Sequence, residues 1–213
     1  MGGIHKFTFG PFAENTFLIE VASGQTVAFD PGMSNPAERT AFDTHLIDHG
    51  LTLSAVLLTH AHLDHVAGLD HCHRVHGCTP RLHPSDLETY RQAPLAANLY
   101  GFPLDDLPTP QADLAHGDVL EFENCSLEIR FAPGHAPGHV VFINHADRYV
   151  IGGDVLFNGS IGRTDLPGGD MQTLLDSIRR ELYSLDDDYT VFCGHGPETT
   201  VGAEKRSNPF VRG

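Results

Sequence analysis

Basic residues are scarce in this sequence, which has 13 Lys and Arg against 28 Asp and Glu over 213 residues. The formal net charge of −15 disfavours a surface that neutralises nucleic-acid phosphates or anionic lipid. Hydrophobic residues make up 40% and charged residues 19%, which is the balance of a globular protein and not of a disordered one. We therefore expect a folded chain with no nucleic-acid and no membrane partner.

Closely paired cysteines and long apolar runs are also missing. The four cysteines form no CxxC pair, which argues against a disulfide scaffold and favours reduced thiols. No stretch approaches the roughly 18 apolar residues that a membrane span needs. The first residues show no basic segment followed by an apolar run, so no signal peptide is indicated. Together these absences predict a cytoplasmic location.

Short apolar segments separated by turns predict an alternation of strands and helices. Strands are expected over residues 15–21, 26–29, 55–58, 119–122, 127–131, 140–144, 149–151 and 190–193. Helices are expected from the N-cap Asn35 to Gly50, from the N-cap Asp170 to Leu182, and over residues 198–207. Residues 77–117 are rich in proline and predict irregular structure around one short helix near residues 86–91.

Strands followed by a helix, twice over, indicate an α/β sandwich with helices on its outer faces. No low-complexity linker divides the chain. We therefore expect a single domain over residues 1–213.

Histidine, by contrast, is abundant, and its 15 residues outnumber Lys and Arg combined. Four ligand-type side chains lie within residues 59–65 (THAHLDH), directly after the strand expected at 55–58. Side chains two residues apart in an extended chain point the same way, so His60 and His62 are placed to bind one ion together. Asp64 and His65 diverge in direction and are placed to serve a neighbouring ion. Because clustering unpaired imidazoles and a carboxylate is costly, the segment predicts a metal site and not a solvated loop.

Three further ligand-type residues also follow expected strands. His135 lies beyond the strand at 127–131, Asp154 beyond the strand at 149–151, and His195 beyond the strand at 190–193. Taken singly, each is better explained as a capping or turn residue. Their recurrence after apolar segments favours a shared position at one edge of a sheet, where sites gather.

The order of these motifs resembles the metallo-β-lactamase-fold superfamily and, within it, the glyoxalase II-like (hydroxyacylglutathione hydrolase-like) hydrolases of the short bacterial type. The matching segments are residues 29–32, 59–65, 133–139, 153–154 and 194–197, which span most of the chain. The resemblance implies a four-layer αβ/βα sandwich with two metals at one shared edge. It also implies the metal ligands, which are His60, His62 and His135 for one ion, Asp64, His65 and His195 for the other, and Asp154 as the bridge.

The resemblance implies roles for four residues besides simple ligation. Asp30 is similar to the family's carboxylate that orients a metal-bound imidazole, and His139 is expected to support the site without binding metal. Asp64 and Asp154 are the expected catalytic residues.

The expected chemistry needs no side-chain nucleophile. A Gly-x-Ser-x-Gly motif is absent, and Cys193 beside His195 is more easily explained as a packed strand residue. Two divalent ions lower the pKa of a shared water toward neutrality and polarise a carbonyl oxygen, so that hydroxide attacks the acyl group. Mixed nitrogen and oxygen ligands suit zinc, which is the expected metal, with iron and manganese as alternatives.

Glyoxalase II-like enzymes are thioesterases, so the resemblance implies a small-molecule thioester substrate such as the glutathione conjugate S-D-lactoylglutathione. Arg163 falls where longer members have a basic residue that contacts the glycine carboxylate of glutathione, which a guanidinium grips bidentately. An ion pair with Asp165 or Asp170 explains Arg163 equally well. The sequence ends at Gly213, without the helical domain that supplies further glutathione contacts in longer members, and it has no counterpart of their nearby tyrosine. Glutathione recognition is therefore left open.

Other activities provide alternatives. A persulfide dioxygenase of this fold uses one iron held by two histidines and a carboxylate, whereas the full set of seven ligand-type residues favours two metals. A lactonase or β-lactamase attacks other acyl bonds, and the Gly-Arg-Thr-Asp segment at 162–165 argues mildly against both. A nuclease is disfavoured by the negative charge. A non-catalytic binding module would be expected to lack ligands, and none is lacking. The sequence does not indicate an oligomeric state.

Overall fold

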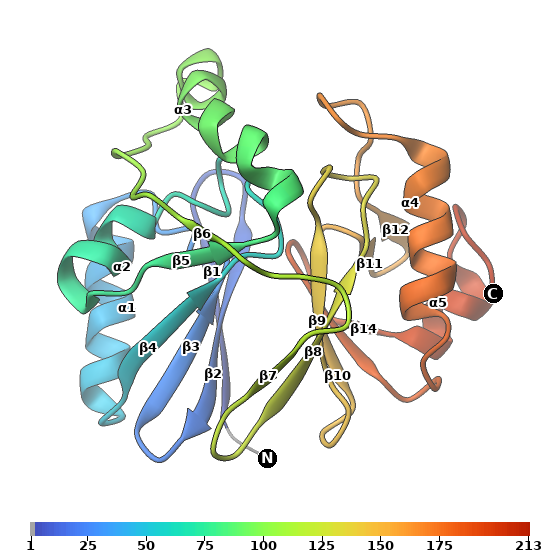
Figure 1. Ribbon diagram of the computed structural model, residues 1–213, viewed down its shortest axis with the longest axis horizontal. Coiled ribbons are helices and arrows are strands. Elements are labelled where there is room, and N and C mark those ends of the chain that lie inside the picture. The colour runs from blue at the N-terminus through green and yellow to red at the C-terminus, as the bar shows by residue number, and fades with distance from the viewer. Residues whose placement is uncertain (1–2) are drawn as a thin grey trace.

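The computed structural model describes residues 3–213, whose main strands form two six-stranded sheets (Figure 1). The first half of the chain contains β1 (Ile4–Phe9), β2 (Glu14–Ala22), β3 (Gln25–Phe29), α1 (Pro36–Asp48), β4 (Thr52–Leu57), α2 (Leu69–His76), β5 (Pro80–Leu82), the 3-10 turn η1 (Pro84–Asp86), α3 (Leu87–Tyr100) and β6 (Gln111–Ala112). The second half contains β7 (Val119–Glu121), β8 (Ser126–Phe131), β9 (Val140–Asn144), β10 (Tyr149–Gly153), β11 (Leu156–Phe157), β12 (Ser160–Ile161), α4 (Met171–Ser177), the π-helical turn η2 (Ile178–Leu182), β13 (Thr190–Cys193), β14 (Thr199–Thr200) and α5 (Val201–Ser207).

Each sheet mixes antiparallel and parallel pairing. The first has the order β1-β2-β3-β4-β5-β6, in which β1, β2 and β3 are antiparallel neighbours and β3 to β6 run parallel. The second has the order β14-β13-β10-β9-β8-β7, in which only β10 and β13 are parallel. Parallel neighbours need crossover connections, and α1, α2, α3 and α4 lie in those connections.

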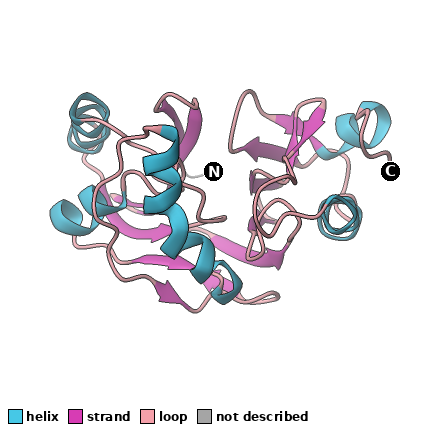
Figure 2. Ribbon diagram, turned by 90° about the horizontal axis from the view of Figure 1, so that it is seen from above, coloured by secondary structure: helices cyan, strands magenta, loops and turns pink. Residues whose placement is uncertain are grey.

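Three apolar clusters hold the layers together. Between the two sheets, Phe29 and Phe142 are fully buried with ring centroids 5.0 Å apart. Phe42 of α1 belongs to the cluster on the outer side of the first sheet, and Leu174 of α4 belongs to the cluster on the outer side of the second. Helices therefore flank both sheets, as the view from above shows (Figure 2), and the predicted four-layer αβ/βα sandwich is confirmed.

The two predicted N-caps explain where two of the helices begin. Asn35 accepts a hydrogen bond from the N–H of Glu38 at 3.1 Å, and Pro36 occupies the first turn of α1. Asp170 accepts one from the N–H of Thr173 at 2.7 Å, at the start of α4. Both side chains satisfy backbone donors that the first helical turn leaves free.

The prediction for residues 77–117 is wrong in one respect, because the helix is long. α3 runs over 14 residues and contains Pro94 in its interior. Proline removes one helical hydrogen bond, but Tyr90, Ala93 and Ala97 are buried against the core of the first half. Tertiary packing therefore outweighs the local preference to break the helix.

Smaller differences concern short elements. The sequence patterns did not predict β1, α2, β5, β6, β11, β12 or β14, and α5 begins only at Val201, after β14, and not at residue 198. Among residues 3–213, no helix has the length and apolar character that crossing a membrane requires.

Candidate metal centre and active-site pocket

The ligand-type residues predicted from the sequence come together where the two sheets meet. Each follows a strand, so each is carried on a loop at the same edge. The loop after β4 supplies His60, His62, Asp64 and His65, and the loops after β8, β10 and β13 supply His135, Asp154 and His195. A backbone hydrogen bond of 2.7 Å from Asn15 N–H to the Gly194 carbonyl joins the halves of the chain beside this edge.

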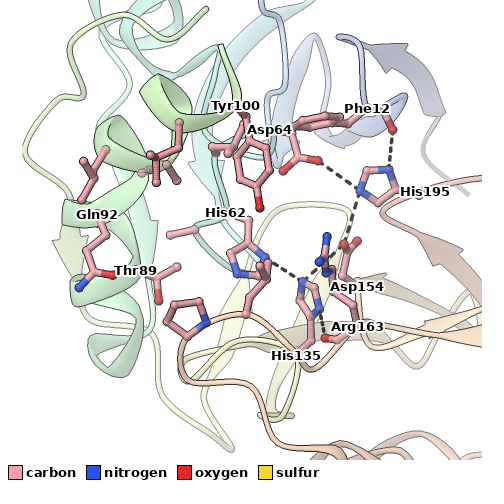
Figure 3. Close-up of a pocket in the computed structure, with 18 of the residues that line it drawn as sticks. Phe12, His62, Asp64, Thr89, Gln92, Tyr100, His135, Asp154, Arg163 and His195 are labelled. Atoms are coloured by element: carbon pink, nitrogen blue, oxygen red, sulfur yellow. Dashed lines mark hydrogen bonds and ion pairs between the residues drawn. The ribbon is translucent and has the colours of Figure 1, made fainter. Parts of the chain in front are cut away.

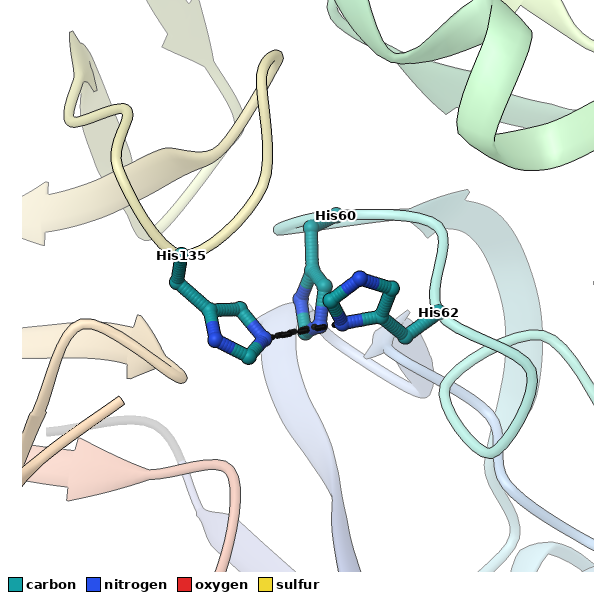
Figure 4. A group of neighbouring side chains, drawn as sticks. All are labelled: His60, His62 and His135. Carbon is teal, nitrogen blue, oxygen red and sulfur yellow. Dashed lines mark hydrogen bonds between the residues drawn. The ribbon is translucent and has the colours of Figure 1, made fainter. Parts of the chain in front are cut away.

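Three imidazoles face one point (Figure 4). His135 Nε2 lies 3.2 Å from His60 Nε2 and 2.8 Å from His62 Nδ1. Burial lowers the pKa of all three histidines, and that of His62 falls to about 3. The rings are therefore neutral near pH 7, and their lone pairs are free to bind a cation.

A second group lies beside the first and contains Asp64, His65 and His195. His195 Nε2 lies 3.3 Å from Asp64 Oδ2, and His65 Nε2 lies 3.9 Å from the same oxygen. Asp154 stands between the groups, because its Oδ2 lies 3.5 Å from His135 Nε2 and 3.4 Å from His195 Nε2 (Figure 3). The structure thus brings together all seven predicted ligands.

Unsatisfied atoms show that the arrangement fits cations. His65 Nε2 and Asp154 Oδ1 are buried and 3.5 Å apart, and within the described residues neither has a hydrogen-bond partner. Buried polar atoms without partners are costly unless a ligand satisfies them. Burial alone would raise the pKa of Asp154, but His65 and His195 hold it well below its usual value, so the carboxylate is charged. Imidazole and carboxylate donors together suit divalent metal ions.

Outer contacts fix the direction of three imidazoles. His135 Nδ1 lies 2.8 Å from the Arg163 carbonyl oxygen, and His195 Nδ1 lies 3.1 Å from the Phe12 carbonyl oxygen. A carbonyl oxygen only accepts, so Nδ1 carries a hydrogen in both rings, and Nε2 is the nitrogen that faces the site. His65 Nδ1 likewise lies 3.2 Å from Asp30 Oδ2. The position of Asp30 agrees with its predicted orienting role.

The second predicted supporting residue, His139, lies outside both groups. Its Nε2 accepts a hydrogen bond of 3.0 Å from the backbone N–H of Asp154, and its ring stacks on His60 with centroids 4.8 Å apart. Because that nitrogen is occupied by an N–H donor, His139 holds the Asp154 backbone and does not offer the same atom to an ion.

Asp86 is a supporting residue that the sequence analysis missed. Its carboxylate accepts one hydrogen bond from the N–H of Ala61, at 2.5 Å, and one from the N–H of Gly138, at 3.0 Å. Ala61 lies between His60 and His62, whereas Gly138 belongs to the loop that carries His135. One buried carboxylate therefore joins the two loops that supply the three-imidazole group. An Asp at the start of a helix gives no signal of this long-range role.

Asn15 supports the remaining loop. Its side-chain N–H₂ group donates to the carbonyl of Cys193 at 2.9 Å and to that of Gly196 at 2.8 Å. These two residues flank Gly194 and His195, so the amide holds both ends of the loop. The alternating pattern of apolar and polar residues in β2 gave no sign of this role for Asn15, because its hydrogen-bond partners lie far away in the sequence.

An open pocket of about 660 Å³ lies over the ligand groups (Figure 3). Its floor includes five of the predicted ligands, namely His62, Asp64, His135, Asp154 and His195. One wall is formed by α3, where Leu95, Leu99 and Tyr100 line the pocket although they are largely exposed. The pocket thus pairs a polar floor with an apolar wall, which is the usual composition of a small-molecule site.

The predicted substrate-binding residue, Arg163, also lines this pocket. Its guanidinium forms a bidentate ion pair with Asp165, at 2.7 Å and 2.8 Å, and both side chains are exposed. The sequence offered two alternatives for Arg163, a place at the substrate pocket or an ion pair with a nearby aspartate. The structure shows Arg163 lining the pocket and paired with Asp165 at the same time.

The fold and this site define the class of protein. A family model described as the metallo-beta-lactamase superfamily matches residues 9–195. The chain belongs to this superfamily and is a metallo-hydrolase.

Individual proteins are similar to this chain over nearly its whole length. The chain is 39% identical over 202 residues to hydroxyacylglutathione hydrolase GloC of Haemophilus influenzae, covering 94% of this chain and 93% of that protein. It is 38% identical over 206 residues to the probable metallo-hydrolase YqgX of Bacillus subtilis, covering 96% and 95% respectively. Among solved structures, TTHA1623 in a di-iron-bound form is 40% identical to this chain, with a TM-score of 0.88. The match covers 97% of this chain and 100% of that structure.

Proposed function

We propose that this metallo-hydrolase is a thioesterase of the hydroxyacylglutathione hydrolase type, which cleaves S-D-lactoylglutathione or a related acyl thioester. The observation that carries the proposal is the convergence of seven ligand-type side chains below an open pocket with one apolar wall. The 39% identity to GloC over most of both chains supports the thioester class.

In this proposal the donors serve two ions that share one carboxylate. One ion would be held by His60, His62 and His135, the other would be held by Asp64, His65 and His195, and Asp154 would contribute to both. Zinc is the proposed metal, and iron is the alternative because the similar TTHA1623 binds two iron ions. When bound, such ions supply a water of lowered pKa and polarise the acyl carbonyl of the substrate.

The residues around the donors hold them in place before substrate arrives. The carbonyls of Phe12 and Arg163 and the carboxylate of Asp30 keep the Nδ1 hydrogens of three imidazoles engaged. Asp86 and Asn15 hold the loops themselves. Donors fixed in this way need little reorganisation during the reaction, which is how a preorganised site lowers a barrier.

The shape of the pocket suits an extended thioester. The reacting carbonyl would lie at the polar floor, and apolar parts of the substrate would lie against Leu95 and Leu99 of α3. We propose that Arg163 exchanges its exposed partner Asp165 for a substrate carboxylate such as that of the glutathione glycine.

A substrate panel tests the proposal. Protein reconstituted with zinc, and separately with iron(II), is assayed with S-D-lactoylglutathione, a thioester lacking glutathione, a lactone and a cephalosporin. We expect the highest kcat/KM with a thioester. A higher kcat/KM for the lactone or the cephalosporin would overturn the proposal. Sulfite formation from glutathione persulfide, with one iron per chain, would assign a persulfide dioxygenase instead.

A further inference from the structure

A second group of metal-ligating side chains lies away from the pocket, between α1 and α2. It consists of Asp43 of α1 with His71 and His76 of α2, and none of the three lines the active-site pocket. The two helices lie together on the outer side of the first sheet (Figure 1). No role proposed above uses these residues.

The geometry of this group resembles that of the catalytic donors. His71 Nε2 lies 3.0 Å from both carboxylate oxygens of Asp43, and His76 Nε2 lies 2.8 Å from Oδ1. All three residues offer ligand atoms that lie within 4.8 Å of one another. Zinc binds such atoms at about 2.0–2.1 Å, and tetrahedral geometry then places neighbouring ligands about 3.4 Å apart. Small side-chain rotations therefore make room for an ion.

The surroundings leave the carboxylate without a competing cation. In residues 3–213, Asp43 forms ion pairs with His71 and His76 and with no Lys or Arg. The exposed side-chain fractions are 28% for Asp43, 13% for His71 and 17% for His76. The group is therefore sheltered enough to be ordered and open enough for water to complete the coordination of an ion.

We propose that Asp43, His71 and His76 form a third metal site, which takes a zinc-like divalent transition-metal ion and braces α1 against α2. α1 follows the segment that carries Asp30, and α2 follows the loop from His60 to His65. A hydrogen bond of 2.6 Å from Gly68 N–H to the Pro31 carbonyl already links those segments. An ion between the helices adds a second link behind the catalytic loop, so its contribution is to stability.

Metal counting in the loaded enzyme tests the site. Protein holding its two active-site zinc ions is equilibrated with buffered free zinc from the nanomolar to the high-micromolar range, and bound zinc per chain is measured. We expect a third equivalent in the wild type and its loss in the double variant His71→Gln/His76→Gln. The control is His73→Gln on the same helix, because His73 is exposed and lies outside the group. Hydrolysis by the two-zinc form should be the same in all three proteins.

Stability and location provide independent readouts. At free zinc about 100-fold above the dissociation constant, the wild-type Tm should rise by about 5–10 °C, and this rise should vanish in Asp43→Asn. Anomalous scattering at the zinc edge should place the third ion among Asp43, His71 and His76. Saturation of the wild type at two ions would overturn the proposal and leave a hydrogen-bonded triad. Retention of the third ion by the double variant, or its location elsewhere, would also overturn it.

Discussion

The Nδ1 atom of His135 lies 2.8 Å from the backbone carbonyl oxygen of Arg163. The arginine thus has two separable parts in this site, because its main chain fixes the direction of a candidate metal ligand while its side chain lies at the pocket. Substitution of the side chain leaves the carbonyl in place, so the two contributions are open to separate measurement.

Replacing Arg163 by alanine should therefore weaken substrate binding without loss of metal. If the guanidinium binds a glutathione carboxylate at this exposed position, KM for S-D-lactoylglutathione should rise about three- to tenfold. Metal content should stay at the wild-type value. Asp165→Ala is the matched control, since it removes the competing partner of Arg163 and should not raise KM. An unchanged KM in Arg163→Ala would remove the arginine from substrate recognition.

Replacing Asp154 should abolish metal retention and turnover together. Asp154→Ala removes a carboxylate that lies between the two ligand groups, so both metal content and thioester hydrolysis should fall, the latter by roughly 100-fold or more. Asp154→Asn keeps the shape but lacks the negative charge and should behave similarly. Asp176→Ala, at an exposed position on α4, removes one charge and serves as the control. Wild-type turnover in Asp154→Ala would contradict the shared-ligand role.

Asp86 should give the folded chain a measurable pH dependence. Burial raises the pKa of Asp86 from 3.8 to about 6, although the N–H groups of Gly138 and Ala61 oppose the rise. Between about pH 4 and pH 6 the folded state binds a proton that the unfolded state has released. The contribution of Asp86 to the free energy of unfolding should therefore decline as pH rises through this window, by about 3 kcal/mol in all.

Urea unfolding of chelator-treated wild type and Asp86→Asn at a series of pH values measures this decline. The neutral amide does not titrate, and it leaves one of the two N–H groups without an acceptor, at a cost of about 1–3 kcal/mol. Since the wild type loses about 3 kcal/mol between pH 4 and pH 6 and the variant loses nothing from this position, the stability gap between the two proteins should shift by about that amount in favour of the variant, and close or reverse by pH 7. A gap that stays constant would contradict the raised pKa.

The apolar wall of the pocket predicts a chain-length effect. Leu99 lines the pocket yet is 79% exposed, so Leu99→Ser should leave Tm unchanged. It should lower kcat/KM for hexanoylglutathione by about three- to tenfold and affect S-D-lactoylglutathione less, because only the longer acyl chain covers apolar surface. Ile47→Ser on α1 is the control, because Ile47 is matched in exposure at 77%. It should change neither Tm nor kcat/KM for either thioester. Equal losses for both thioesters would argue against contact between the acyl chain and α3.

Local patterns predicted an α/β sandwich and favoured a shared edge for the ligand-type residues, and the family resemblance implied the four-layer arrangement and the seven ligands. Apolar runs followed by glycine and histidine mark the ends of the strands that carry these residues. The N-caps Asn35 and Asp170 likewise act within a single helical turn.

What escaped prediction depends on contacts between distant residues. Pro94 indicated a break, and only the burial of Tyr90, Ala93 and Ala97 on another element keeps α3 continuous. Asp86 contacts Gly138 across 52 positions of sequence, a pairing that no local pattern reports.

The ligand groups draw on loops from both halves of the chain, so neither half possesses a complete coordination sphere. A polypeptide cleaved between β6 and β7 would separate His62 from His135, whose ring nitrogens now lie 2.8 Å apart. Bound ions would therefore add to the apolar cluster between the sheets in joining the two fragments, so the proposed centre would contribute to assembly of the fold as well as to the reaction.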